Sequence, residues 1–141
     1  MGTFLNNYQK VREKKNSVLC VGLDPALPQQ RKANCIPERY LHGRNLNQAR
    51  LGFCLDIVQQ TKDYACAFKP NQQYIAGFTH EEHRALTQSI REANAVSVLD
   101  YKLNDIGDTV ESALYHIGEW GYDAATYNPF LGNLEEAVRI A

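Results

Sequence analysis

Short apolar runs alternate with longer amphipathic segments along this sequence, and that alternation constrains its fold more than any other feature. Four runs are typical of β-strands: Ser17–Leu23, Ala65–Phe68, Val96–Lys102 and Asp123–Tyr127. Five segments have helical periodicity: Thr3–Lys15, Asn47–Tyr64, Thr79–Asn94, Asp108–Trp120 and Leu131–Ala141. Strands that alternate with helices predict an α/β domain with a parallel sheet and right-handed crossovers.

Each predicted strand ends in a polar side chain next to a loop. These side chains are Asp24, Lys69, Asp100 with Lys102, and Asn128. Parallel strands place all their carboxyl ends on one side of a sheet, where the catalytic residues of α/β enzymes lie. We therefore expect these side chains to converge on one candidate site.

The most informative stretch is Val96–Thr109, where a strand runs into charged residues. Side chains alternate across a strand, so Asp100 and Lys102 point to one side. A partly buried acid and amine must pair or shift their pKa values. An isolated Asp–Lys ion pair at a strand end is most often structural. Here, however, a second acid follows at Asp105. Two carboxylates and an amine at one strand end favour a site where the lysine is held protonated and aimed.

Composition excludes several other classes of protein. The formal net charge of −1 gives no overall attraction to nucleic acid or to an anionic membrane. No apolar run approaches the roughly 20 residues that span a bilayer, and the polar segment Met1–Ser17 does not resemble a secretory signal. The four cysteines form no metal-binding motif. We expect a cytoplasmic protein with no metal site.

Several other residues carry structural expectations. Cys20, Cys54 and Cys66 lie in apolar stretches and are expected in the core, with Ser17–Leu23 buried on both faces. Thr79 and Glu82 have the spacing of a capping box. Further expectations are that His80 and His83 are solvated, that Arg31-Lys32 is surface charge, and that Leu27–Leu46 is a long polar loop without an assigned role.

Four motifs together resemble one enzyme family. They are Val-Gly-Leu-Asp-Pro at 21–25, Phe-Lys-Pro-Asn at 68–71, Asp-Tyr-Lys-Leu-Asn-Asp-Ile-Gly-Asp-Thr at 100–109 and Asn-Pro-Phe-Leu-Gly at 128–132. This set resembles orotidine 5′-phosphate decarboxylase, in particular its longer bacterial branch. The resemblance implies a homodimer of cofactor-free, metal-free (β/α)8 barrels. A complete barrel needs about 200 residues or more. Residues 1–141 are then expected to be the amino-terminal part of one barrel domain, with its first four βα units.

The resemblance also implies a role for each site residue. The reaction is decarboxylation of orotidine 5′-phosphate to UMP and CO2 in pyrimidine biosynthesis, with Lys102 as the proton donor beside Asp100 in a Lys-Asp-Lys-Asp network. Lys69 is expected to join the network and contact the ribose, and Asp24 is expected to hold the ribose hydroxyls. Asp105, Ile106 and Thr109 are expected to reach the neighbouring subunit's site. Asn128 is expected to line the site. The family's phosphate-binding groups lie in the second half of the barrel, which this chain lacks.

Two alternatives remain open from the sequence. The first is a sugar-phosphate decarboxylase or synthase of the same superfamily, often with a magnesium ion held by strand-end acids; Lys69 and Thr109 argue against it. The second is a half-barrel that has lost catalysis and serves as an assembly subunit.

Overall fold

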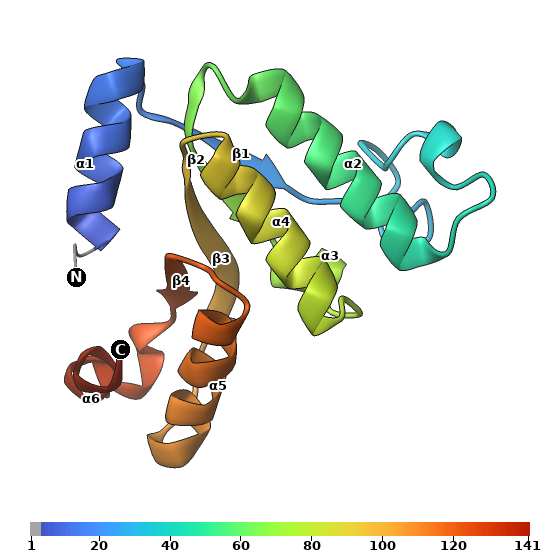
Figure 1. Ribbon diagram of the computed structural model, residues 1–141. Coiled ribbons are helices and arrows are strands. Elements are labelled where there is room, and N and C mark those ends of the chain that lie inside the picture. The colour runs from blue at the N-terminus through green and yellow to red at the C-terminus, as the bar shows by residue number, and fades with distance from the viewer. Residues whose placement is uncertain (1–3) are drawn as a thin grey trace.

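The four strands form one parallel sheet whose spatial order, β1-β2-β3-β4, is also their order in the chain. The computed structural model describes residues 4–141. Its strands are β1 (Leu19–Leu23), β2 (Ala65–Pro70), β3 (Val96–Leu103) and β4 (Ala124–Tyr127). Its helices are α1 (Phe4–Lys15), α2 (Leu46–Thr61), α3 (Gln72–Ile75), α4 (His80–Glu92), α5 (Gly107–Glu119) and α6 (Leu134–Ile140), with 3-10 turns at Glu38–Tyr40 and Pro129–Leu131. The predicted α/β class and parallel sheet are confirmed (Figure 1).

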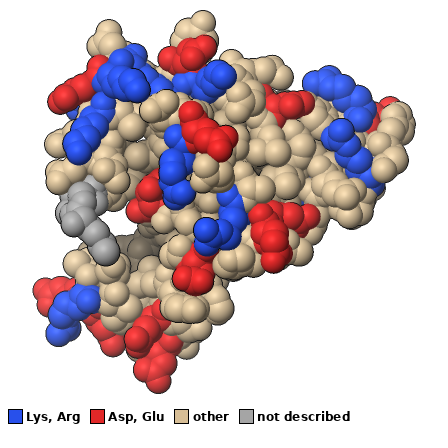
Figure 2. Space-filling model, in the orientation of Figure 1, with Lys and Arg blue, Asp and Glu red and all other residues tan. Residues whose placement is uncertain are grey.

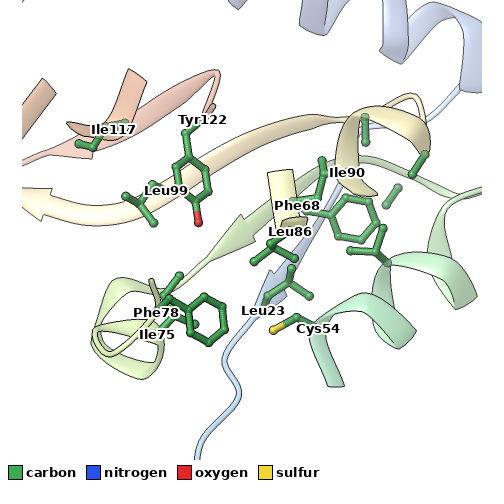
Figure 3. Packing of buried hydrophobic residues seen from close by; sticks show 14 residues of the cluster. Leu23, Cys54, Phe68, Ile75, Phe78, Leu86, Ile90, Leu99, Ile117 and Tyr122 are labelled. Carbon is green, nitrogen blue, oxygen red and sulfur yellow. The ribbon is translucent and has the colours of Figure 1, made fainter. Parts of the chain in front are cut away.

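The main hydrophobic core lies between the sheet and the helices that connect its strands. Phe68 of β2 and Leu99 of β3 are fully buried and pack against the apolar faces of α2, α4 and α5 (Figure 3). Those helices contribute Cys54 and Val58, Leu86 and Ile90, and Ile117, respectively. Each crossover helix thus packs on the same side of the sheet, which is the geometry that right-handed crossovers produce.

Local capping signals explain where α2 and α4 begin. The Thr79 side chain accepts a hydrogen bond from the Glu82 N–H, and the Glu82 carboxylate accepts one from the Thr79 N–H. The predicted capping box is therefore confirmed. Asn45 and Gln48 form the same reciprocal arrangement at the start of α2. Each box satisfies backbone donors that a helix start would otherwise leave unpaired.

Helix α1 lies at the amino ends of the strands and is held there by Lys15. The Lys15 ammonium donates hydrogen bonds of 2.7 Å to the carbonyls of Lys62, Ala65 and Ala93, which lie just before or at the starts of β2 and β3. Tyr8 and Val11 of the helix pack against a small cluster on these two strands. The predicted first residue of this helix, Thr3, lies outside the described residues.

Strand β1 departs from expectation. It is exposed over much of its length rather than buried on both faces, and Cys20 is exposed, whereas Cys54 and Cys66 are buried as expected. The reason is its place in the sheet. β1 is an edge strand, so it has a strand neighbour on one side only.

The connection from β1 to α2 is more structured than a polar loop. Leu27, Ile36 and Tyr40 pack with Ala49 of α2 into a second, smaller buried cluster. The Tyr40 hydroxyl donates to Asp56 of α2 at 2.6 Å. These contacts anchor the loop to α2.

Two helices differ from the prediction. Helix α3 was not predicted from the sequence. Helix α6 begins at Leu134 rather than Leu131, because a 3-10 turn and Gly132, with φ of +74°, come first.

The expectation that His83 is solvated is wrong. Its side chain is only 1% exposed and stacks on the Trp120 ring, with ring centroids 4.2 Å apart. Its neighbour His80 is exposed, as expected. His80 is the first residue of α4 and lies at its exposed end, whereas His83, one turn further along, is covered by Trp120.

The surface mixes charges of both signs. Figure 2 shows Lys and Arg interspersed with Asp and Glu on the face drawn. Within residues 4–141, no helix combines the length and the apolar character needed to cross a membrane.

Candidate active site

The carboxyl ends of the strands bring two lysine side chains together around the Asp100 carboxylate. The Lys69 ammonium contacts Asp100 Oδ2, and the Lys102 ammonium lies 2.8 Å from Asp100 Oδ1. The Asp100 side chain is 10% exposed, whereas that of Lys102 is 59% exposed. A buried carboxylate thus holds an ammonium that reaches toward solvent, where a ligand can approach it.

Strand register explains this convergence. β1 and β2 pair so that Leu23 aligns with Pro70, and Asn71 forms a parallel bridge with Asp100. Lys69 lies two residues before Asn71, so it shares that side of β2, and its long side chain reaches along the strand to the Asp100 carboxylate. Asp100 and Lys102 share one side of β3, whereas Leu99 points into the core on the other side.

Opposing effects act on the pKa of Asp100. Burial raises it, but hydrogen bonds from Lys102, Lys69 and Thr126 outweigh burial and lower the pKa to about 2. The positive charge of Lys69 adds to this lowering. Asp100 is therefore ionised throughout the physiological range, and it keeps two ammonium groups close to each other despite their like charge.

The backbone at Lys102 is unusual. Its φ is +56°, a left-handed conformation that a side chain disfavours. Pairing between β3 and β4 shifts register between Leu99 and Leu103, so the departure coincides with an irregularity of the strand. The Lys102 N–H donates to the Thr126 hydroxyl of β4 at 2.9 Å. Strained backbone of this kind clusters at functional sites.

Asp24 follows β1 and pairs with an arginine rather than with the two lysines. Arg31 Nη1 lies 3.8 Å from Asp24 Oδ2, and its guanidinium carbon lies 5.5 Å from the centre of the Tyr74 ring. Arg31 also donates to the Asn34 carbonyl. Arg31 is thus half-buried and paired with Asp24, whereas its neighbour Lys32 is exposed, as expected.

The remaining predicted site residues lie apart from Asp100. The Asp105 carboxylate accepts a hydrogen bond from the Ile106 N–H at 2.9 Å, and within residues 4–141 no hydrogen bond or ion pair is recorded between it and Lys102. Ile106 and Thr109 are exposed at the start of α5. Asn128 is exposed, and its side chain accepts from the Phe130 N–H. One chain thus assembles Lys69, Asp100 and Lys102, but not Asp105.

Two contributors to the site were missed in the sequence. Thr126 precedes Asn128 by two residues on a strand, so alternation alone places it on the same face as that strand-end residue. Arg31 had no comparable signal, because its contact with Asp24 depends on the path of the loop. Among residues 4–141, no group of three or more His, Cys, Asp or Glu side chains is placed to hold a metal ion.

Comparisons with known proteins identify relatives of this chain. The model of the orotidine 5′-phosphate decarboxylase / HUMPS family matches residues 17–141. The chain is 35% identical to the orotidine 5′-phosphate decarboxylase of Paracidovorax citrulli, in an alignment that covers 92% of this chain and 46% of that protein. The chain thus spans about half the length of this relative.

Solved structures give the same result. A Toxoplasma gondii protein solved as an orotidine-monophosphate decarboxylase superimposes with a TM-score of 0.75 at 25% identity, over 95% of this chain and 43% of that one. UMP synthase of Leishmania donovani superimposes with a TM-score of 0.71 at 28% identity, over 99% of this chain and 28% of that one. The four βα units are therefore half of a (β/α)8 barrel, and the chain belongs to the orotidine 5′-phosphate decarboxylase / HUMPS family.

Proposed function

We propose that the protein decarboxylates orotidine 5′-phosphate to UMP and CO2 in pyrimidine biosynthesis, without a cofactor or a metal. The observation that carries this proposal is the ionised Asp100 carboxylate between the Lys69 and Lys102 ammonium groups, at the strand ends of a half-barrel of this family. The activity is assigned to the whole protein. We propose that residues 1–141 are the amino-terminal part of its barrel domain, and that the second half supplies the phosphate-binding groups.

The proposed chemistry follows from where charge develops. The bond between C6 and the carboxylate breaks, CO2 leaves, and the electron pair stays on C6. The Lys102 ammonium then donates a proton to C6 and is reprotonated from solvent. A cation beside C6 stabilises the developing negative charge more than the ground state, which is the condition for lowering a barrier. Asp100, 2.8 Å from the Lys102 ammonium, supports its charged form and its position.

The other site residues take binding roles in this proposal. Lys69 completes the charged network and contacts the ribose, and Asp24 holds the ribose hydroxyls in the orientation that Arg31 favours. Asn128 lines the site. The protein acts as a cytoplasmic homodimer in which Asp105, Ile106 and Thr109 reach the neighbouring subunit's site. The exposure of Ile106 and Thr109 leaves both free for such a contact.

The direct test removes the proton donor. In the full-length protein, Lys102→Ala should lower kcat by at least the ~10²–10⁴-fold that positioned proton transfer contributes, measured as loss of orotidine 5′-phosphate absorbance. Lys10→Ala, an exposed lysine on α1, is the matched control. Activity of Lys102→Ala equal to that of the control would rule out Lys102 as the proton donor. Turnover should persist after chelation of divalent metals; loss on chelation with recovery in magnesium would instead favour a magnesium-dependent member of the superfamily.

The shared site has its own test. Lys102→Ala and Asp105→Ala homodimers should each be nearly inactive. A mixed dimer would contain one site with both residues intact and should recover part of the activity. Tagged, co-purified heterodimers establish that mixing has occurred. Inactive heterodimers would argue that Asp105 acts within its own subunit.

A further inference from the structure

The hydroxyl of Thr126 lies between the two groups on which the proposed reaction depends. Thr126 is half-buried on β4. Its Oγ1 accepts a hydrogen bond of 2.9 Å from the Lys102 backbone N–H and donates one of 3.0 Å to Asp100 Oδ1. The same carboxylate oxygen contacts the Lys102 ammonium at 2.8 Å. One side chain therefore joins the backbone of the lysine to the carboxylate that holds its ammonium.

The direction of both hydrogen bonds is determined by their partners. A backbone N–H can only donate, and an ionised carboxylate can only accept. The hydroxyl must therefore accept from Lys102 and point its own proton at Asp100. The hydroxyl proton is thereby directed at Asp100 while the oxygen accepts from the Lys102 N–H.

Lys102 needs such a restraint. Its φ of +56° is disfavoured for a residue with a side chain, and it occurs where β3 and β4 shift register. A disfavoured backbone conformation persists only where its surroundings hold it. Of the contacts that hold this backbone, the bond to Thr126 is the one that also reaches the Asp100 carboxylate.

We propose that Thr126 is a positioning residue of this site, which sets the Lys102 backbone and the Asp100 carboxylate relative to each other and so aims the Lys102 ammonium. The inference rests on the proposed function, because an aimed ammonium matters to a proton-transfer step. The hydroxyl itself takes no part in bond breaking. It acts through Lys102 and Asp100.

Two substitutions separate positioning from packing. Thr126→Val keeps the branched shape that suits a strand but removes both hydrogen bonds, whereas Thr126→Ser keeps the hydroxyl. In the full-length protein, Thr126→Val should lower kcat by up to about 100-fold, the loss that a misplacement of about 1 Å can cause, with KM nearly unchanged. Thr126→Ser should restore most of kcat. Thr61→Val, which removes a hydroxyl bonded within α2, is the matched control and should change neither parameter.

A second measurement does not depend on turnover. Hydrogen exchange of the Lys102 amide should be faster in Thr126→Val than in the wild type or in Thr126→Ser, because the acceptor is lost. Faster exchange in a protein without decarboxylase activity would support the positioning and refute the proposed function. Unchanged exchange together with unchanged kcat in Thr126→Val would overturn the inference, as would equal losses of kcat in Thr126→Val and Thr126→Ser.

Discussion

Burial of His83 should make the stability of this protein depend on pH in a defined window. The imidazole of His83 stacks on Trp120 with an interplanar angle of 11° and meets the Phe78 ring edge-on, with centroids 5.6 Å apart. Its Nδ1 lies 3.0 Å from the Tyr122 hydroxyl. A charged ring at this position would lose its hydration and gain no carboxylate partner from these neighbours.

The size of the effect follows from the pKa. Burial, with a smaller contribution from the charge of His80, lowers the pKa of His83 from 6.5 to about 4. This gap corresponds to about 3 kcal/mol of unfolding free energy at full effect. Below pH 6.5 the unfolded chain binds a proton that the folded chain resists. The contribution of His83 is therefore complete above pH 6.5 and is lost progressively as the pH falls toward 4.

Urea unfolding between pH 7.5 and 4 measures this dependence. The unfolding free energy of the wild type should fall by about 3 kcal/mol more over this range than that of His83→Phe, which keeps a ring in the stack and cannot be protonated. His116→Phe, at an exposed position on α5, is the control and should follow the wild type. Equal slopes for the wild type and His83→Phe would refute the reasoning. The Asp100 carboxylate does not affect this comparison. Its pKa is lowered from 3.8 to about 2, so its contribution to the unfolding free energy is lost as the pH falls below 3.8.

Three further predictions test other contacts. Lys15→Met should lower the unfolding free energy by about 1.5–3 kcal/mol, because it removes a charged donor from three carbonyls; Lys10→Met should be neutral, and equal effects would refute the anchor role. Thr79→Ala should cost about 1 kcal/mol through loss of the capping box, whereas no change in the urea midpoint would show that the cap contributes nothing. Arg31→Ala should raise KM with little change in kcat if Asp24 holds the ribose hydroxyls as proposed, and an unchanged KM would remove Arg31 from the site.

Much of the fold could be predicted because its signals are local. Apolar runs, amphipathic stripes and the capping box at Thr79 and Glu82 depend on residues within a few positions of each other, and the structure confirms the four strands and their parallel order. The alternation of strands and helices further restricts the topology, because crossovers have one preferred hand. The placement of Asp100 and Lys102 on one side of β3 could also be predicted, because it depends only on the alternation of side chains along one strand.

Errors arose where burial depends on distant parts of the chain. The segments of Cys20 and His83 are a strand and a helix, as their patterns predict. The predicted exposure of the two side chains is nevertheless wrong: Cys20 is exposed and His83 is buried. Cys20 is exposed because β1 is an edge strand, and His83 is buried because Trp120 and Tyr122 reach it from the far end of α5. Neither neighbour is visible in local periodicity.

The sequence by itself determined which residue types end each strand, and therefore which side chains were candidates for chemistry. Only the tertiary structure decided which of them meet. It joined Lys69, Asp100 and Lys102, added Thr126 across the sheet and left Asp105 apart. The physical reason is that strand periodicity sets the face on which a side chain lies, whereas register and loop path set the distances between strands, on which ion pairs and hydrogen bonds depend.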